Sequence, residues 1–212
     1  MSRRRLARSF FDRPAEVVAP ELLGRLLVRA LPDGSRLSGS IVEAEAYEPG
    51  DPASHGFRGP TPRTASMFGP PGRLFVYFTY GNHWMMNAVT REAGVGSAVL
   101  IRAVEPREGL DRMAANRGRD APRDLCSGPG KLTQALAVDA SLDGADLTRG
   151  REVWLEAGAL VAPEHILAGP RVGVSAGVDA AWRFFVRDSP WVSRGRPGPP
   201  SRRARPRTQP TR

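Results

Sequence analysis

Two glutamates in one predicted strand are the residues of this sequence best placed for acid–base chemistry. Polar and apolar residues alternate from Ile41 to Tyr47, so Glu43, Glu45 and Tyr47 share one face of the strand. Carboxylates about 7 Å apart along a strand can accept or donate protons in a reaction. Two strand glutamates held in salt bridges would have the same sequence, so a catalytic and a structural interpretation both stay open.

A guanidinium is predicted to face these carboxylates. Ser97 to Ala103 reads as a strand in which Arg102 shares a face with Ala98 and Leu100. A buried arginine needs an acidic partner, and Glu45 is a plausible one. A purely structural ion pair would look the same in sequence.

An aromatic hairpin is predicted from Arg73 to Val89. Its first strand is dense in aromatic and β-branched residues and contains Tyr77, and Tyr80-Gly81-Asn82-His83 forms the tip. Tyr80 either projects from this tip or folds back onto its own hairpin.

Two further segments have the composition of ligand-binding loops. Glu48 to Pro71 contains His55 and Arg63 and is long for a structureless loop, which favours a functional role. The turn Cys126–Lys131 opens a helix predicted to run to about Val138. The free N–H groups at a helix start can hold phosphate, so Ser127 and Lys131 are candidates for a phosphate site. The spacing of a P-loop is absent. Three histidines and one cysteine give no zinc-like spacing, and we expect no metal site.

The remaining pattern predicts short helices and strands. Pro20 is expected to divide a helix that begins near Asp12 and ends near Gly24. The other expected elements are strands at Leu26–Leu31, Arg36–Tyr47, Glu152–Glu156, Arg171–Val174 and Arg183–Val186, a helix at Glu105–Asn116 and a loop at Gly118–Arg123.

Length and composition exclude several classes of protein. At 212 residues one domain with a real core is the default. There is no run of about 18 apolar residues and no apolar core after the basic first residues, so neither a membrane span nor a secretory peptide is expected. Cys126 stands alone, which excludes an internal disulfide and fits a reducing cytoplasm.

The net charge of +9 comes from the two ends of the chain. Seven arginines and no acid lie in residues 194–212, and four arginines lie in the first eight residues, so residues 9–193 carry about −2. The ends either hold a polyanion or are simply solvated. Lys131 is the only lysine, which leaves few candidates for an amine nucleophile.

At these residues the sequence resembles the alkyladenine (3-methyladenine) DNA glycosylase family. The matches run in order across about residues 6–193: Glu43–Tyr47, Ala53–His55, Thr61–Arg63, Met67–Phe68, Tyr77–Gly81, Met86–Asn87, Leu100–Ala103, Glu105–Pro106, Cys126–Pro129, Lys131–Leu132, Arg171–Val174 and Ser189–Val192. So many ordered matches are more specific than any single motif.

The resemblance implies a single α+β domain, placed at residues 1–193, with a curved antiparallel sheet, surrounding helices and a protruding β-hairpin. We expect residues 194–212 to be a disordered Arg- and Pro-rich tail. The implied activity is that of a cofactor-free enzyme that removes damaged purines from double-stranded DNA. We expect a monomer, since base extrusion needs no second copy, and a location in the cytoplasm, at the nucleoid if the protein is bacterial.

The resemblance also implies roles for particular residues. Glu45 would be the general base that activates water, and Arg102 and the backbone carbonyl of Val172 would hold that water. The extruded base would be contacted by Tyr47, His55, Tyr77 and Asn87, Tyr80 would fill the gap left in the DNA, and Arg63, Ser127 and Lys131 would contact the DNA backbone. The sequence departs from the family at Asn82, Thr64 and Met85, where methionine, asparagine and cysteine are common.

Two other functions fit parts of the sequence. A DNA-binding protein without catalysis would use the basic ends and the hairpin, but would have no use for Glu45 and Arg102 on facing strands. A hydrolase of free nucleosides or glycans would use the carboxylates, but would not need an exposed Tyr80.

Overall fold

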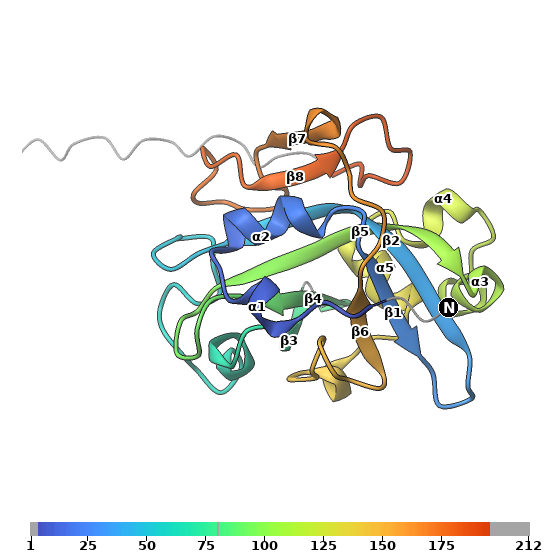
Figure 1. The fold of residues 1–212 in the computed structure, drawn as a ribbon, viewed down its shortest axis with the longest axis horizontal. Helices are drawn as coiled ribbons and strands as arrows, with labels where there is room; N and C mark the ends of the chain where they lie inside the picture. The colour runs from blue at the N-terminus through green and yellow to red at the C-terminus, as the bar shows by residue number, and fades with distance from the viewer. Residues whose placement is uncertain (1–3, 80, 196–212) are drawn as a thin grey trace, which may run out of the picture.

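The computed structural model describes residues 4–79 and 81–195. Within these residues eight strands form one sheet, and every pair in it is antiparallel. The strands are β1 (Leu26–Ala30), β2 (Arg36–Tyr47), β3 (Leu74–Thr79), β4 (His83–Val89), β5 (Ala98–Glu108), β6 (Val153–Glu156), β7 (Ile166–Gly169) and β8 (Arg183–Val186). Their main order is β3-β4-β5-β2-β1-β6, and β8 joins β2 to β7 (Figure 1).

The long strand β2 organises the sheet. It pairs with β5 along one edge; on the other edge its first half pairs with β1, and residues 43–45 pair with β8. The register between β2 and β5 shifts next to Glu43, where Ile41 faces Val104 but Glu43 faces Ala103. Such a bulge bends a strand and redirects side chains, here within the segment that carries both glutamates.

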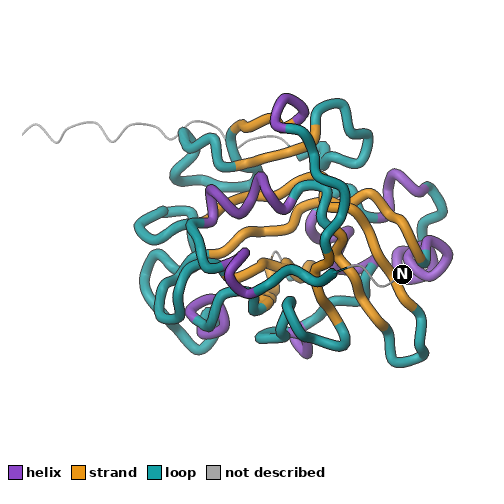
Figure 2. The backbone as a smooth tube through the Cα atoms, viewed as in Figure 1, coloured by secondary structure: helices purple, strands orange, loops and turns teal. Residues whose placement is uncertain are grey.

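Short helices surround the sheet (Figure 2). They are α1 (Arg8–Phe11), α2 (Ala15–Leu22), α3 (Leu110–Arg117), α4 (Pro122–Leu125) and α5 (Pro129–Ala135), with 3-10 turns η1 (Ala65–Phe68), η2 (Ala140–Leu142) and η3 (Pro163–His165). The buried face of α2 packs in the core with Ala44 and Ala46, which leaves the opposite face of β2 for Glu45 and Tyr47. The predicted single α+β domain with a curved antiparallel sheet is confirmed.

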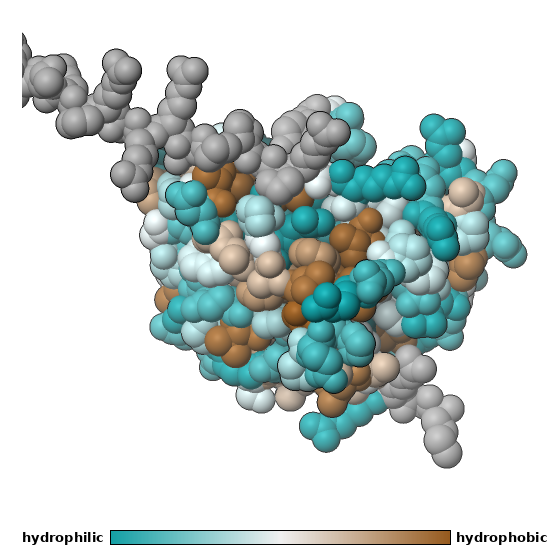
Figure 3. All heavy atoms as spheres, turned by 90° about the horizontal axis from the view of Figure 1, so that it is seen from above, coloured by the Kyte–Doolittle hydropathy of each residue, from teal (hydrophilic) through white to brown (hydrophobic). Residues whose placement is uncertain are grey.

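Most large apolar side chains are inside, among them Phe11, Leu22, Ile41 and Ile101. Figure 3 shows one face of the molecule, where apolar residues gather in groups separated by hydrophilic ones. Phe78 of β3 is one of the large apolar side chains that remain exposed. No helix among the described residues is long and apolar enough to cross a membrane.

The expected break at Pro20 is wrong. Pro20 lies inside α2, and the break between the two short helices falls at residues 12–14, with Pro14 as the N-cap of α2. A proline removes one backbone hydrogen bond, and the burial of Ala15, Val18 and Leu22 against the sheet outweighs that loss in so short a helix.

Three other boundaries need correction. Residues 105–108 continue β5 instead of starting a helix, because they pair with residues 38–40 of β2, and α3 begins only after Gly109 at φ 74°. Arg171–Val174 is a loop; β7, which was not predicted, pairs with β8 instead. The expected loop at 118–123 overlaps the start of α4. The domain boundary at 193 stays a prediction, and residues 196–212 lie outside the described part of the chain.

Candidate active site

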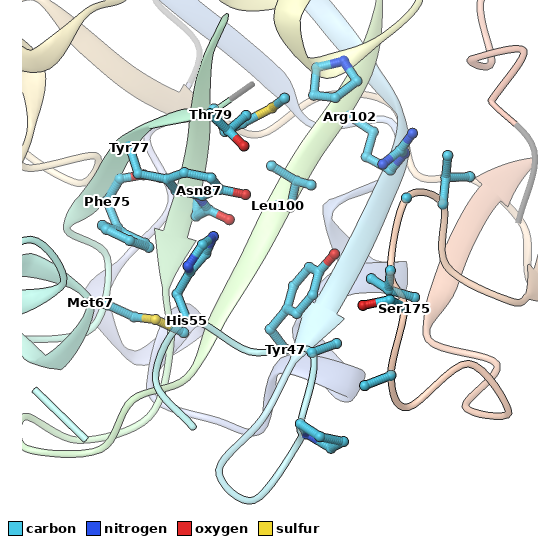
Figure 4. Close-up of a pocket in the computed structure, with 18 residues that line it drawn as sticks. Tyr47, His55, Met67, Phe75, Tyr77, Thr79, Asn87, Leu100, Arg102 and Ser175 are labelled. Carbon is cyan, nitrogen blue, oxygen red and sulfur yellow. The ribbon is translucent and has the colours of Figure 1, made fainter. Parts of the chain in front are cut away.

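A cavity of about 360 Å³ lies on the Tyr47 face of the sheet. Strands β2, β3, β4 and β5 contribute to its wall, together with the loops at 52–55 and 172–176. It brings together six of the residues that the sequence singled out: Tyr47, His55, Tyr77, Asn87 and Arg102, which are labelled in Figure 4, and Val172. These residues are up to 125 positions apart in the chain. The antiparallel pairing of four strands gathers Tyr47, Tyr77, Asn87 and Arg102, and two loops add His55 and Val172.

One side of the cavity is an aromatic wall. The rings of His55 and Tyr77 meet edge to face with centroids 4.1 Å apart, and Phe75 lies 5.3 Å from Tyr77. His55 keeps much of its surface exposed, yet desolvation of the part packed against the cavity wall lowers its pKa below the usual value of 6.5, and the nearby charge of Arg63 lowers it further. His55 is therefore a neutral ring at pH 7.

Tyr47 forms the opposite wall (Figure 4). Behind its ring lies the fully buried guanidinium of Arg171, 4.7 Å from the Tyr47 centroid and 5.3 Å from that of Trp182. Arg171 is fixed in turn by both carboxylate oxygens of Asp51, one of them at 2.9 Å, and by the carbonyl oxygen of Ala46 at 3.0 Å. The ring of Tyr47 is therefore held rigidly from behind, with its other face toward the cavity.

Asn87 is placed by its strand partner. Its side-chain nitrogen donates a hydrogen bond to the carbonyl oxygen of Phe75 at 3.1 Å, across the β3–β4 pair. This contact fixes the orientation of a side chain that is 4 % exposed and lines the cavity.

Glu45 lies directly behind the cavity wall. Its side chain is fully buried; Oε1 accepts the backbone N–H of Val172 at 2.7 Å, and Oε2 accepts the Tyr47 hydroxyl at 2.9 Å and Nη1 of Arg102 at 3.2 Å. All three partners line the cavity, whereas Glu45 does not. The carboxylate expected to act as the general base is therefore closed off from the cavity in this conformation.

The phenol of Tyr47 stays protonated in this arrangement. Burial raises the pKa of Tyr47 well above its usual value of 10, and the neighbouring charge of Glu45 raises it further. A protonated phenol is a steady hydrogen-bond donor, so Tyr47 covers the Oε2 atom of Glu45.

The predicted pairing of Glu45 with Arg102 is observed, and further polar residues join it. Arg102 also binds Glu43, which binds Arg183 of β8 and Ser193. Neither Arg183 nor Ser193 was predicted, and Asp51 and Arg171 were also missed as wall supports. Tertiary packing brings these residues to the site from distant parts of the chain. Arg171 lies in the segment Arg171–Val174 that resembles the family, but its sequence did not indicate that it supports the wall.

The three residues expected on the DNA backbone lie in two places. Ser127 and Lys131 line a second cavity of about 600 Å³, which shares Arg102 and Pro129 with the first. Lys131 pairs there with Asp124. Arg63 is exposed and donates to the carbonyl oxygen of Phe78 on the hairpin.

Two of the expected roles belong to Tyr80 and to the carbonyl group of Val172. Tyr80 lies outside the described residues; the residue before it, Thr79, lines the cavity. The carbonyl of Val172 has a predicted role in holding water, whereas the contact observed is that of its N–H group. Among residues 4–79 and 81–195, no cluster of three or more His, Cys, Asp or Glu side chains could hold a metal ion.

An aromatic-walled cavity with a carboxylate–guanidinium pair at its wall can bind a flat ring and hold an acid–base group close to it. Comparison with known proteins is consistent with this chemistry. The family model described as methylpurine-DNA glycosylase matches residues 9–190. The chain belongs to this family of DNA glycosylases.

Individual relatives cover almost the whole chain. A protein of Carboxydothermus hydrogenoformans is 47 % identical over 189 residues, covering 89 % of this chain and 98 % of the relative. Relatives from Burkholderia lata (49 %, 93 % of each chain) and Rhodopseudomonas palustris (50 %, 90 % and 91 %) are similar. All three bear the name "Putative 3-methyladenine DNA glycosylase". The predicted enzyme class, a monofunctional DNA glycosylase that hydrolyses N-glycosyl bonds, is confirmed.

Proposed function

We propose that this enzyme extrudes alkylated or deaminated purines from duplex DNA and hydrolyses their N-glycosidic bond with a water activated by Glu45. The observation that carries the proposal is the position of the Glu45–Arg102 pair directly behind a cavity walled by Tyr47, His55 and Tyr77. A base inside the duplex cannot be reached, so the nucleotide must swing out, at a cost of a few kcal/mol.

The cavity suits a purine. Its volume of about 360 Å³ lies within the range of small-ligand pockets, roughly 300–1,000 Å³. Tyr47 on one side and His55 with Tyr77 on the other offer ring faces to a flat base, and an electron-poor alkylated purine is attracted to electron-rich rings. A neutral His55 adds no charge repulsion against a cationic base. Asn87 would press against the purine edge and disfavour the 2-amino group of guanine.

Hydrolysis requires water to reach Glu45. The Tyr47 hydroxyl now covers Oε2, so it must move aside when the base stacks and water enters. Glu45 then takes the proton of water while the oxygen attacks C1′ of the sugar, and the purine leaves with the bonding electrons. The carboxylate also stabilises the cation-like sugar, and Arg102 with the carbonyl of Val172 would orient the water.

The DNA backbone would be held on both sides of the cavity. The second cavity carries Lys131, Arg123 and Arg194 and adjoins the first, so it is suited to phosphates next to the extruded nucleotide. Arg63 would bind phosphate near the hairpin. Tyr80 would enter the stack and offset part of the cost of extrusion. One copy of the chain supplies all these groups, so the enzyme would act as a monomer.

Water is the proposed nucleophile for a further reason. Lys131, the only lysine, lines the second cavity and pairs with Asp124, while the base-sized cavity is lined by no amine. The enzyme would therefore leave an abasic site and an intact strand. A covalent enzyme–DNA adduct trapped by borohydride would contradict this.

A single-turnover assay on a duplex with one hypoxanthine, read by heat–alkali cleavage, tests the proposal. Glu45→Gln should bind the duplex but excise about 10²- to 10⁴-fold more slowly, the usual contribution of a general base. Glu156→Gln is the matched control, because Glu156 is also buried and paired but lies on β6, away from the cavity. Excision by Glu45→Gln at the wild-type rate would refute the assignment of the base.

The same assay separates the two rival functions. A DNA-binding protein without catalysis would leave the wild-type duplex uncut. A hydrolase of free nucleosides would be indifferent to Tyr80→Ala, whereas a glycosylase should lose activity on duplex DNA when the wedge is removed.

A further inference from the structure

Glu43 is a second buried carboxylate beside the site, and the reaction described above does not use it. It is fully buried. Its Oε1 accepts Nε of Arg102 at 2.9 Å, Nε of Arg183 at 2.7 Å and Oγ of Ser193 at 2.9 Å, and its Oε2 accepts the backbone N–H of Ser193 at 2.7 Å. A carboxylate with four donors on three separate segments is a fixed anion.

Arg102 divides its hydrogen bonds between the two carboxylates. Nε binds Glu43, Nη1 binds Glu45 at 3.2 Å, and Nη2 binds Oγ of Ser193 at 3.2 Å. The planar guanidinium is thus held along both edges before any substrate arrives.

The two negative and two positive side chains of this cluster neutralise one another only when all four are present. Glu43 and Glu45 on β2 oppose Arg102 on β5 and Arg183 on β8, and all four are buried or nearly so. The other groups facing Glu45 are the Tyr47 hydroxyl and the N–H of Val172, with Arg171 behind Tyr47. When Glu45 takes a proton from water, its negative charge disappears and Arg102 would lose half of its anionic surroundings.

We infer that Glu43 is a positioning residue for the reaction: it keeps Arg102 oriented and electrically compensated while Glu45 changes from carboxylate to carboxylic acid. This inference rests on the proposed function of Glu45 as the base. The reason is that Arg102 binds both carboxylates at once. A buried cation without an anionic partner is costly, and the pair between Arg102 and Glu43 remains when Glu45 becomes protonated.

The pH dependence of single-turnover excision tests this inference in Glu43→Gln. Glutamine has the same size but no charge, so Glu45 should hold its proton less tightly. The acid limb of the rate profile should then move to lower pH by about one unit, and the plateau rate should fall roughly tenfold. Glu43→Asp, which restores the charge, should bring the limb back toward the wild-type position. Ser193→Ala removes hydrogen bonds but no charge, and should leave the limb where it is.

A purely structural role for Glu43 predicts a different result. The rate or the melting temperature would fall in Glu43→Gln with the acid limb unmoved, and that outcome would overturn the inference. If Glu43→Gln does not fold, Arg183→Gln alters the same charge balance in the opposite sense and should move the limb to higher pH; an unmoved limb there would also overturn it. The Glu45→Gln assay is a separate test. Excision by Glu45→Gln at the normal rate would contradict the proposed function. Slow excision by Glu45→Gln, together with an unchanged acid limb in Glu43→Gln, would contradict only the role of Glu43.

Discussion

The hydroxyl of Tyr47 donates a hydrogen bond to Oε2 of Glu45 across 2.9 Å, and this contact closes the carboxylate off from the cavity. The same tyrosine therefore forms the wall against which a base would stack and the cover over the proposed general base. If the incoming base displaces the ring of Tyr47 or turns its hydroxyl away, the base stacks and Glu45 becomes accessible in the same event.

Tyr47→Phe separates these two roles. Phenylalanine keeps the ring but removes the hydroxyl that covers Glu45, so the excision rate should stay within about tenfold of wild type. Tyr47→Leu removes the stacking surface, worth about 1–3 kcal/mol per base, and should weaken the retention of the damaged base roughly 5- to 150-fold. Single-turnover excision measures both. A Tyr47→Phe enzyme as slow as Glu45→Gln would show that the hydroxyl takes part in the chemistry.

The ionisation of His55 should depend on Arg63. Burial and the charge of Arg63 both lower the pKa of His55 from its usual 6.5. Arg63→Gln removes one of these causes, so the NMR titration midpoint of His55 should rise toward 6.5. Arg58→Gln, an exposed change in the same loop, is the control and should leave the midpoint unchanged.

The lowered pKa of His55 should also make the stability of the protein depend on pH. The folded protein disfavours protonated His55, so the unfolded chain binds more protons near pH 6. The free energy of unfolding should therefore decrease as the pH falls through about 6.5. His55→Gln should flatten this dependence in urea titrations at pH 5.5 and 7.5; an unchanged slope would mean that His55 is not the group responsible.

Asp51 should stabilise the wall of the cavity through Arg171. Both side chains are almost fully buried, and breaking a buried ion pair costs about 3–5 kcal/mol. Asp51→Asn should therefore lower the melting temperature by roughly 6–20 °C and weaken base binding, because Arg171 no longer holds the ring of Tyr47 as firmly. Glu21→Gln removes the partner of an exposed arginine, Arg13, and should change the melting temperature little. Equal losses in the two variants would contradict the buried-pair argument.

Gly130 should be needed for docking the hairpin onto α5. A Cβ at this position would lie 2.7 Å from Cγ of His83, closer than atoms can pack. Gly130→Ala should push the β3–β4 hairpin away from α5 and weaken binding to damaged duplex DNA, with a smaller effect on overall stability. Gly169→Ala on β7 is the matched control, since its Cβ would meet only Phe185 at 4.0 Å. Fluorescence anisotropy with a labelled lesion duplex measures the difference, and equal affinities would rule out the docking role.

The sequence predicted those parts of the site that lie within single strands. The alternation from Ile41 to Tyr47 placed Glu43, Glu45 and Tyr47 on one face, and the pattern around Arg102 predicted the facing guanidinium. The choice of Glu45 as the base came from the resemblance to the family. The sequence could not predict that the Tyr47 hydroxyl covers Glu45, because that depends on side-chain rotation. Nor could it predict the contacts of Arg183 and Ser193 with Glu43, about 140–150 residues away, which arise from tertiary packing.

The errors in the predicted fold have the same origin. Residues 105–108 have a helix-like composition, yet their pairing with the start of β2 makes them a strand. Pro20 breaks a helix by local rules, yet the packing of α2 on the sheet retains it. In each case a contact distant in sequence overrides the local preference.

The bond between Glu43 and Ser193 has a consequence for biosynthesis. Because translation proceeds from the N-terminus, β2 leaves the ribosome before Val172, Arg183 and Ser193 do, and these three residues supply four of the seven hydrogen bonds to Glu43 and Glu45. In a nascent chain with the early strands already paired, the two carboxylates would still lack these donors until residues 172–193 have been made.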